Sequence, residues 1–118
     1  MGNLAMVLQD LGRAGEAEPL LRRALAINEQ VHGPGHPDIA IRLSNLALVL
    51  RDLGRAADAE PLLGRALAIN EQVHGPDHPA VAISLGNLAT VLYDLGRYGE
   101  AEPLLGRVED IRRRGKAS

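Results

Sequence analysis

The chain repeats itself every 42 residues, and this repeat restricts its fold more than any other feature. Residues 3–42 and 45–84 agree at about 31 of 40 positions, and a third copy starts at Asn87 and loses the pattern after Arg107. The invariant landmarks, each 42 residues from the next, are Asn3, Asn45 and Asn87, then Gly12, Gly54 and Gly96, then Pro19, Pro61 and Pro103. Such a period indicates one supersecondary unit used several times.

Each unit is predicted to contain two helices. In the middle unit the first helix runs from Pro37 to Leu53, since proline suits a first helical position and Gly54 suits the residue after the last. The second helix runs from about Ala57 to Val73, with Pro61 at roughly its fourth or fifth position. At 100° per residue, the predicted apolar faces are Ala40, Leu43, Leu46, Ala47, Leu50 and Leu53, and then Ala59, Leu62, Leu63, Ala66, Ile69 and Val73. No strand-like alternation is found.

One such helix pair is too thin to bury its own apolar face, whereas stacked pairs bury a continuous core. The expected fold is therefore all-α, a superhelical solenoid of three antiparallel helix pairs in a single domain, 1–118. Its units are approximately 1–36, 37–78 and 79–114, and the first lacks the start of its first helix. The core must consist of Leu, Ala, Ile and Val, because the chain has two Tyr and no Phe or Trp.

A period of 42 also occurs in HEAT and armadillo units and in propeller blades, but blades need strands. The ordered string Asn-Leu-Ala-x-x-Leu-x-Asp-x-Gly-Arg, Ala-Glu-Pro-Leu, Gly-Pro-Asp-His-Pro resembles the tetratricopeptide repeat, in the 42-residue form of kinesin light chains. The resemblance covers about residues 3–107, although aromatic residues common in that family are replaced here by Leu or Ala.

The resemblance implies that the first helix of each unit lines a concave groove in which an extended peptide lies. It also implies that Asn3, Asn45 and Asn87 form a ladder of amides that holds a peptide backbone, with donor and acceptor in each side chain. The alternative is that these amides bond only to water or to neighbouring helices. The expected groove residues are Asn3, Met6, Ile41, Asn45, Leu48, Arg51, Asp52, Ile83, Asn87, Thr90, Tyr93 and Asp94.

Two histidines lie four residues apart in each sequence Val-His-Gly-Pro-x-His-Pro. His36 and His78 stand at about the N-cap of the following helix, where a ring nitrogen could accept a backbone N–H, and Asp77 could do so instead. A metal clip is the competing interpretation. The Gly-Pro between the histidines argues against it, because it breaks any helix that would align the rings. No metal site and no cofactor are expected.

Asp10, Asp52 and Asp94 lie in the last turn of each first helix, where the helix dipole disfavours an anion. They are expected to form inter-helix ion pairs or to bond the next helix's N–H groups; an acidic strip for basic ligands is the alternative. The basic tail, residues 110–116, is interpreted as the polar end of the last helix rather than as a phosphate or lipid contact.

Nothing in the sequence indicates an enzyme: there is no Cys, no glycine-rich phosphate loop, and the acidic pairs recur in every unit. A net charge of −2 and the lack of a long apolar run give no reason to expect nucleic-acid or membrane binding. The start has no basic leader, so a cytoplasmic location is expected. The predicted function is a protein–protein interaction scaffold. The alternative is a structural spacer or self-associating part of a longer array, which could form homo-oligomers through open solenoid ends.

Overall fold

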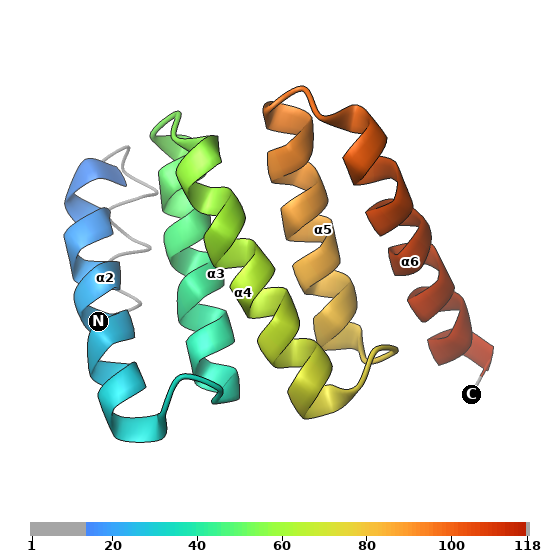
Figure 1. Ribbon diagram of the computed structural model, residues 1–118, viewed down its shortest axis with the longest axis horizontal. Coiled ribbons are helices and arrows are strands. Elements are labelled where there is room, and N and C mark those ends of the chain that lie inside the picture. The colour runs from blue at the N-terminus through green and yellow to red at the C-terminus, as the bar shows by residue number, and fades with distance from the viewer. Residues whose placement is uncertain (1–13, 118) are drawn as a thin grey trace.

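The computed structural model describes residues 14–117 and consists, over that range, of helices without any strand. Their bounds, in chain order, are α2 Ala14–His32, α3 Pro37–Asp52, α4 Ala56–His74, α5 Pro79–Asp94 and α6 Tyr98–Ala117. Each helix packs against the next, and α3 also contacts α5, so the helices follow one another along the molecule (Figure 1). The all-α repeat fold predicted from the sequence is confirmed.

Both first helices start as the sequence predicts. Pro37 and Pro79 are the first helical residues, and the preceding histidines cap the helices. The Nδ1 atom of His36 accepts the backbone N–H of Asp38 at 3.1 Å, and Nδ1 of His78 accepts that of Ala80 at 3.0 Å. This bond satisfies one of the N–H groups that every helix start leaves without an intrahelical partner. In the third unit the cap is therefore His78 rather than Asp77.

Glycine ends the helices where the chain must turn. Gly54 and Gly96 follow the first helices with φ of 77° and 76°, and Gly33 and Gly75 follow the second helices with φ of 83° and 87°. A side chain makes this left-handed conformation costly, so glycine is favoured. The short turns that result set consecutive helices antiparallel.

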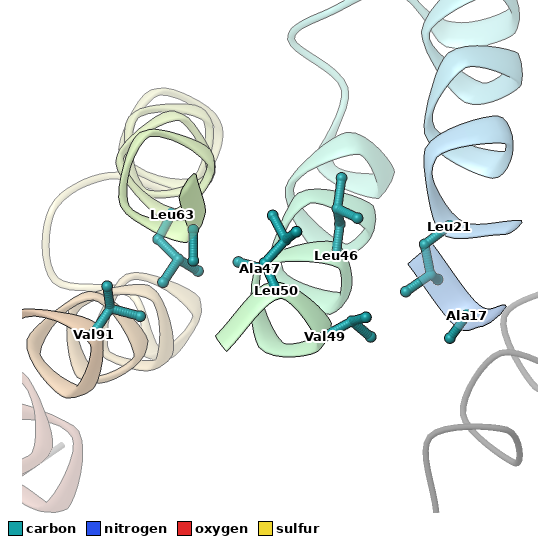
Figure 2. Packing of buried hydrophobic residues seen from close by; sticks show 9 residues of the cluster. Ala17, Leu21, Leu46, Ala47, Val49, Leu50, Leu63 and Val91 are labelled. Carbon is teal, nitrogen blue, oxygen red and sulfur yellow. The ribbon is translucent and has the colours of Figure 1, made fainter. Parts of the chain in front are cut away.

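The core is buried both within each helix pair and between successive pairs. Val49 of α3 faces Ala17 and Leu21 of α2, while Ala47 lies on the side of α3 that faces Leu63 of α4 (Figure 2). Since α3 is packed between two helices, it buries two sides of its surface. The stripe predicted from one hairpin is therefore too narrow.

The prediction that Leu53 and Val73 belong to the buried apolar faces is wrong. Leu53 is 36% exposed and Val73 is 46% exposed, because each lies at the end of its helix, beyond the neighbouring helix pair. Ile39 and Val49, which the single-hairpin pattern leaves out, are fully buried instead. The other predicted core residues of α3 and α4 are buried, except Leu62, which is partly buried against the core.

The second helix begins one residue earlier than predicted, at Ala56, so Pro61 is its sixth residue rather than its fourth or fifth. Pro19 in α2 and Pro103 in α6 hold the same place. A residue with an N–H at this position would bond the carbonyl four residues before it, so each second helix lacks one such bond. All three prolines face solvent.

Ion pairs also follow the 42-residue period and join each second helix to the next unit. Arg55 Nη1 lies 2.8 Å from Glu18 Oε1, and its equivalent Arg97 Nη1 lies 2.5 Å from Glu60 Oε1. A second set joins Arg65 to Glu29 at 3.0 Å and Arg107 to Glu71 at 3.1 Å. Exposed pairs of this kind stabilise little individually, but they favour one register of unit on unit.

We expect opposite effects when alanine replaces two glycines of the middle unit. Gly54→Ala forces a β-carbon into the left-handed region and should destabilise the fold by about 1–2 kcal/mol. Gly64→Ala, inside α4 with no atom within 4 Å of the added carbon, should stabilise it by about 0.5–1 kcal/mol. Urea unfolding followed by circular dichroism measures both. Equal signs for the two variants would contradict the assigned backbone conformations.

Stability should fall in acid because arginines stabilise ionised carboxylates. The hydrogen bond from Arg97 lowers the pKa of Glu100 below its usual 4.5. A lowered folded-state pKa means that stabilisation is complete above pH 4.5 and is lost as the pH falls through the folded-state value. Arg97→Gln should therefore flatten the decrease in unfolding free energy below pH 4.5, measured by urea titrations across that range. An unchanged slope would show that this ion pair does not contribute.

Candidate functional site

An open pocket of about 460 Å³ lies between α3 and α5, near the end of α4. Three elements line this α3–α5 pocket. Their residues are Pro37, Ala40, Ile41, Ser44, Asn45 and Leu48 of α3, Asn70 and His74 of α4, and Ala80, Ile83, Ser84 and Asn87 of α5. None of these residues is an Asp, Glu, Lys or Arg, so the wall consists of aliphatic groups, amides, hydroxyls and one imidazole.

Five of the groove residues expected from the sequence line this pocket: Ile41, Asn45, Leu48, Ile83 and Asn87. Ile41 is 57% exposed and Ile83 is 67% exposed, so equivalent large aliphatic side chains of two successive first helices are accessible at the pocket. Asn3 and Met6 lie outside the described residues. Arg51, Asp52, Thr90, Tyr93 and Asp94 do not line the pocket.

The side-chain amides of Asn45 and Asn87 form no hydrogen bond to any residue within the described range 14–117. Both side chains are half-buried in the pocket wall. The asparagines of the second helices differ: Asn28 Nδ2 donates to the Ala24 carbonyl at 3.0 Å, and Asn70 Nδ2 donates to Ser84 Oγ at 2.8 Å. Among the asparagines that line the pocket, Asn45 and Asn87 therefore keep their whole amide for a molecule outside the fold, whereas Asn70 uses one N–H within it.

The Asn70–Ser84 bond forms the polar part of the pocket floor. Ser84 is the one polar residue in the described part of the chain that is buried in the core, with 2% exposure. Asn70 and Ser84 come from different units, so this bond also joins α4 to α5. The sequence gives no periodic signal for it, because the residue 42 positions before Ser84 is Arg42.

Two expected groove residues pair with each other. Arg51 of α3 binds the carboxylate of Asp94 of α5 through its Nε atom, and this hydrogen bond raises the pKa of Arg51. Asp94 thus forms the inter-helix ion pair expected for this position, with Arg51 of the preceding unit as its partner. Asp10 lies outside the described residues.

Two further expected residues use their hydroxyls within the fold. Tyr93 donates to Glu102 Oε1 at 2.8 Å, which raises the pKa of Tyr93. Thr90 donates to the Gly86 carbonyl at 2.9 Å. Arg55 and Arg97 pair with carboxylates of the second helices, Glu18 and Asp58 for Arg55 and Glu60 and Glu100 for Arg97.

The histidine turns depart from the sequence interpretation in one respect. The rings of His32 and His36 stack with centroids 4.4 Å apart, and those of His74 and His78 stack at 4.2 Å. The Gly-Pro sequence does break the helix, as expected, but the turn that follows still stacks the two rings. In stacked rings the nitrogen lone pairs lie in nearly parallel planes, so they do not converge on one metal ion. In addition, Nδ1 of each capping histidine already accepts a backbone N–H. Within residues 14–117 no cluster of three or more His, Cys, Asp or Glu side chains is arranged around a possible metal position.

Within residues 14–117, none of the helices combines the length and the apolar character that crossing a membrane requires.

Comparison with known proteins gives a consistent family. The tetratricopeptide repeat family model matches residues 1–70 and again 38–114. No curated protein matches the chain. One similar solved structure is the crystal structure of a kinesin light chain candidate from Podosopora anserina, which has nearly identical TPR-like repeats. Its sequence is 28% identical to this chain, and the two structures superpose with a TM-score of 0.86. A single-residue variant of that protein has the same 28% sequence identity and a TM-score of 0.87.

Both structures match 98% of this chain and 55% of their own. BtubC (BKLC) from P. vanneervenii shares the fold, with a TM-score of 0.91 at 24% sequence identity. The match covers 99% of this chain and 47% of BtubC. The chain thus spans about half the length of the solved structures it matches. With its 42-residue period and these likenesses, the chain belongs to the tetratricopeptide repeat family, in its kinesin-light-chain-like form.

Proposed function

We propose that the chain is a protein-interaction module that holds an extended peptide segment of its partner in the groove lined by α3 and α5. Tetratricopeptide repeats generally mediate protein–protein contact, and this supports the class of function. The chain would act as one repeat domain, built of the units 1–36, 37–78 and 79–114.

The observation that carries the proposal is a pair of side-chain amides that bond no other residue within 14–117, the range that the structure describes. Asn45 and Asn87 hold equivalent places in successive units and line one pocket beside the exposed Ile41 and Ile83. A side-chain amide offers a donor and an acceptor, which is what one peptide unit requires. In the open pocket these amides are accessible to water, so a bound peptide backbone replaces amide–water hydrogen bonds with direct ones and gains the usual small net contribution of each bond.

The surrounding aliphatic surface supports the same function. Ile41, Leu48 and Ile83 offer apolar area that a ligand side chain would remove from water. The pocket is open to solvent, so a ligand can reach it from outside the fold. The pocket's lining residues suit hydrogen bonding and apolar contact. Among them, no serine is hydrogen-bonded to a base that would make it a nucleophile.

Asn45→Ala with Asn87→Ala should weaken peptide binding about tenfold or more, since each neutral hydrogen bond contributes about 0.5–1.5 kcal/mol. The melting temperature should hardly change, because neither amide bonds another described residue. Peptides selected on an array would be measured by fluorescence anisotropy against both proteins. The matched control is Gln30→Ala with Gln72→Ala, an equivalent pair of exposed residues on α2 and α4 that does not line the pocket.

Light scattering separates this function from a spacer or self-associating role. A concentration-independent monomer whose peptide affinity depends on Asn45 and Asn87 supports the proposal. A stable oligomer that selects no peptide, or binding equally weakened by the control pair, would reject it.

A further inference from the structure

The turns that join successive units contain all four histidines of the chain. His32 ends α2 and His36 caps α3, and His74 and His78 hold the equivalent places between α4 and α5. In each turn the two rings stack, with interplanar angles of 25° and 17°. Residues 32–36 are here called the first histidine joint, and residues 74–78 the second.

The cap bond in each joint requires a neutral ring. Nδ1 of His36 accepts the backbone N–H of Asp38, and Nδ1 of His78 accepts that of Ala80. An accepting nitrogen carries no hydrogen, so the hydrogen of the neutral ring lies on Nε2. Protonation puts a hydrogen on Nδ1 as well, and the former acceptor then points a donor at a donor. A protonated His36 or His78 therefore cannot cap its helix.

A positive charge on a capping histidine is also unfavourable at its position in the fold. The N-terminus of a helix is the positive end of the helix dipole, so α3 and α5 disfavour a cation there. The partner ring is stacked only 4.4 Å away in the first joint and 4.2 Å away in the second, so two charged rings would repel each other. His32 and His74 differ, because each ends a helix, where the dipole favours a cation. The capping histidines are therefore the acid-sensitive members of the two pairs.

The first turns of α3 and α5, which these caps hold, carry part of the core. Ile39 and Val81 are the third residues of these helices, and both are fully buried. Ile39 belongs to a cluster with Ala66 and Ile69 of α4, against which Leu25 of α2 also packs. Fraying of the first turn would therefore loosen contacts with both neighbouring helices, so the loss of one cap reduces the stability of the whole stack.

The charged groups around the two joints differ. In the first joint the carboxylate of Asp38 lies 3.9 Å from Nδ1 of His36, where it offsets part of a positive charge on the ring. The equivalent residue of the second joint is Ala80. The carboxylate in the second joint, Asp77, pairs with Arg114 of α6 at 2.5 Å. The glutamates one turn before the joints also pair with arginines of the next second helix, Glu29 with Arg65 and Glu71 with Arg107.

We propose that the two histidine joints make the stacking of the units sensitive to acid. Histidine ordinarily becomes protonated near pH 6.5. A proton on His36 or His78 removes the cap of α3 or α5 and loosens that helix against its neighbours. The second joint responds more strongly, because Asp77 is already paired with Arg114. This inference goes beyond the proposed function and does not depend on it.

The test compares the chain with a variant whose caps cannot titrate. Asparagine is a favoured N-cap, and its side-chain oxygen accepts the same N–H at any pH. His36→Asn with His78→Asn should therefore be about as stable as the unmodified chain at about pH 7.5. On going to about pH 5.5, the equilibrium constant for unfolding should rise about tenfold more in the unmodified chain, since each proton that binds only the unfolded state contributes up to about tenfold over this range. Urea unfolding followed by circular dichroism measures both proteins, and the titration of His32 and His74 cancels because both proteins retain them.

Single variants show which joint responds. His78→Asn should remove more of the acid sensitivity than His36→Asn. Asp38→Ala gives the first joint the residue that the second has at this place, and it should make the first joint more sensitive. As a local readout, the backbone amide resonance of Ala80 should shift between about pH 7.5 and about pH 5.5 as the cap bond is lost. The amide resonance of Asp58 should not shift, because α4 begins without a side-chain cap bond.

This pH range lies above the one in which Glu100 loses its stabilising charge, which is below pH 4.5. Equal acid sensitivity of the unmodified chain and the double asparagine variant overturns the proposal. So does an Ala80 resonance that shifts with pH while stability stays constant, since the cap would then titrate without affecting the stack. Equal effects of the two single variants reject the stronger response of the second joint. The groove function is tested separately, through Asn45 and Asn87, and stands or falls independently of these results.

Discussion

Burial of apolar surface between successive helices is the interaction on which the whole structure depends. No helix pair here has an aromatic core of its own, and the interior consists of Leu, Ala, Val and Ile from neighbouring pairs. Because α3 contacts α2 on one side and α4 on the other, its two buried faces leave a single remaining face (Figure 1). The same holds for α5. The surface available to a partner is therefore a consequence of how the core is buried.

Much of this architecture is readable from the sequence because the repeat gives each signal more than once. Glycine and proline mark the helix ends by their backbone preferences, which are local, and His36 and His78 cap by a local bond. Contacts between units are not local. The burial of Ile39 and Val49, and the pairing of Arg55 with Glu18, depend on how one pair lies on the next, which a single hairpin pattern does not contain.

The candidate site was predictable to the same extent and for the same reason. Placing residues opposite the core identified Ile41, Asn45 and Leu48, which line the pocket together with Ile83 and Asn87 of α5. The sequence does not separate Asn45 from Asn70, since both are repeated asparagines, and only the bond to Ser84 shows that Asn70 is used within the fold. Likewise, Arg51 and Asp94 read as separate groove charges until their distance in space shows them paired.

Repetition and selectivity place opposite demands on such a surface. Positions that are identical in every unit, such as the first-helix asparagines, can recognise only what every part of a ligand shares, which is its backbone. Discrimination between ligands has to come from positions where the units differ while the backbone stays the same. Asn70 and Arg112 form such a pair, as do Arg51 and Tyr93. In the second pair both side chains are engaged within the fold, by Asp94 and Glu102, whereas Arg112 has no carboxylate partner in the described part of the chain. Unit-specific charges such as Arg42 and Arg112, which form no ion pair with a carboxylate among residues 14–117, are consequently better suited to such discrimination than Arg51 or Tyr93.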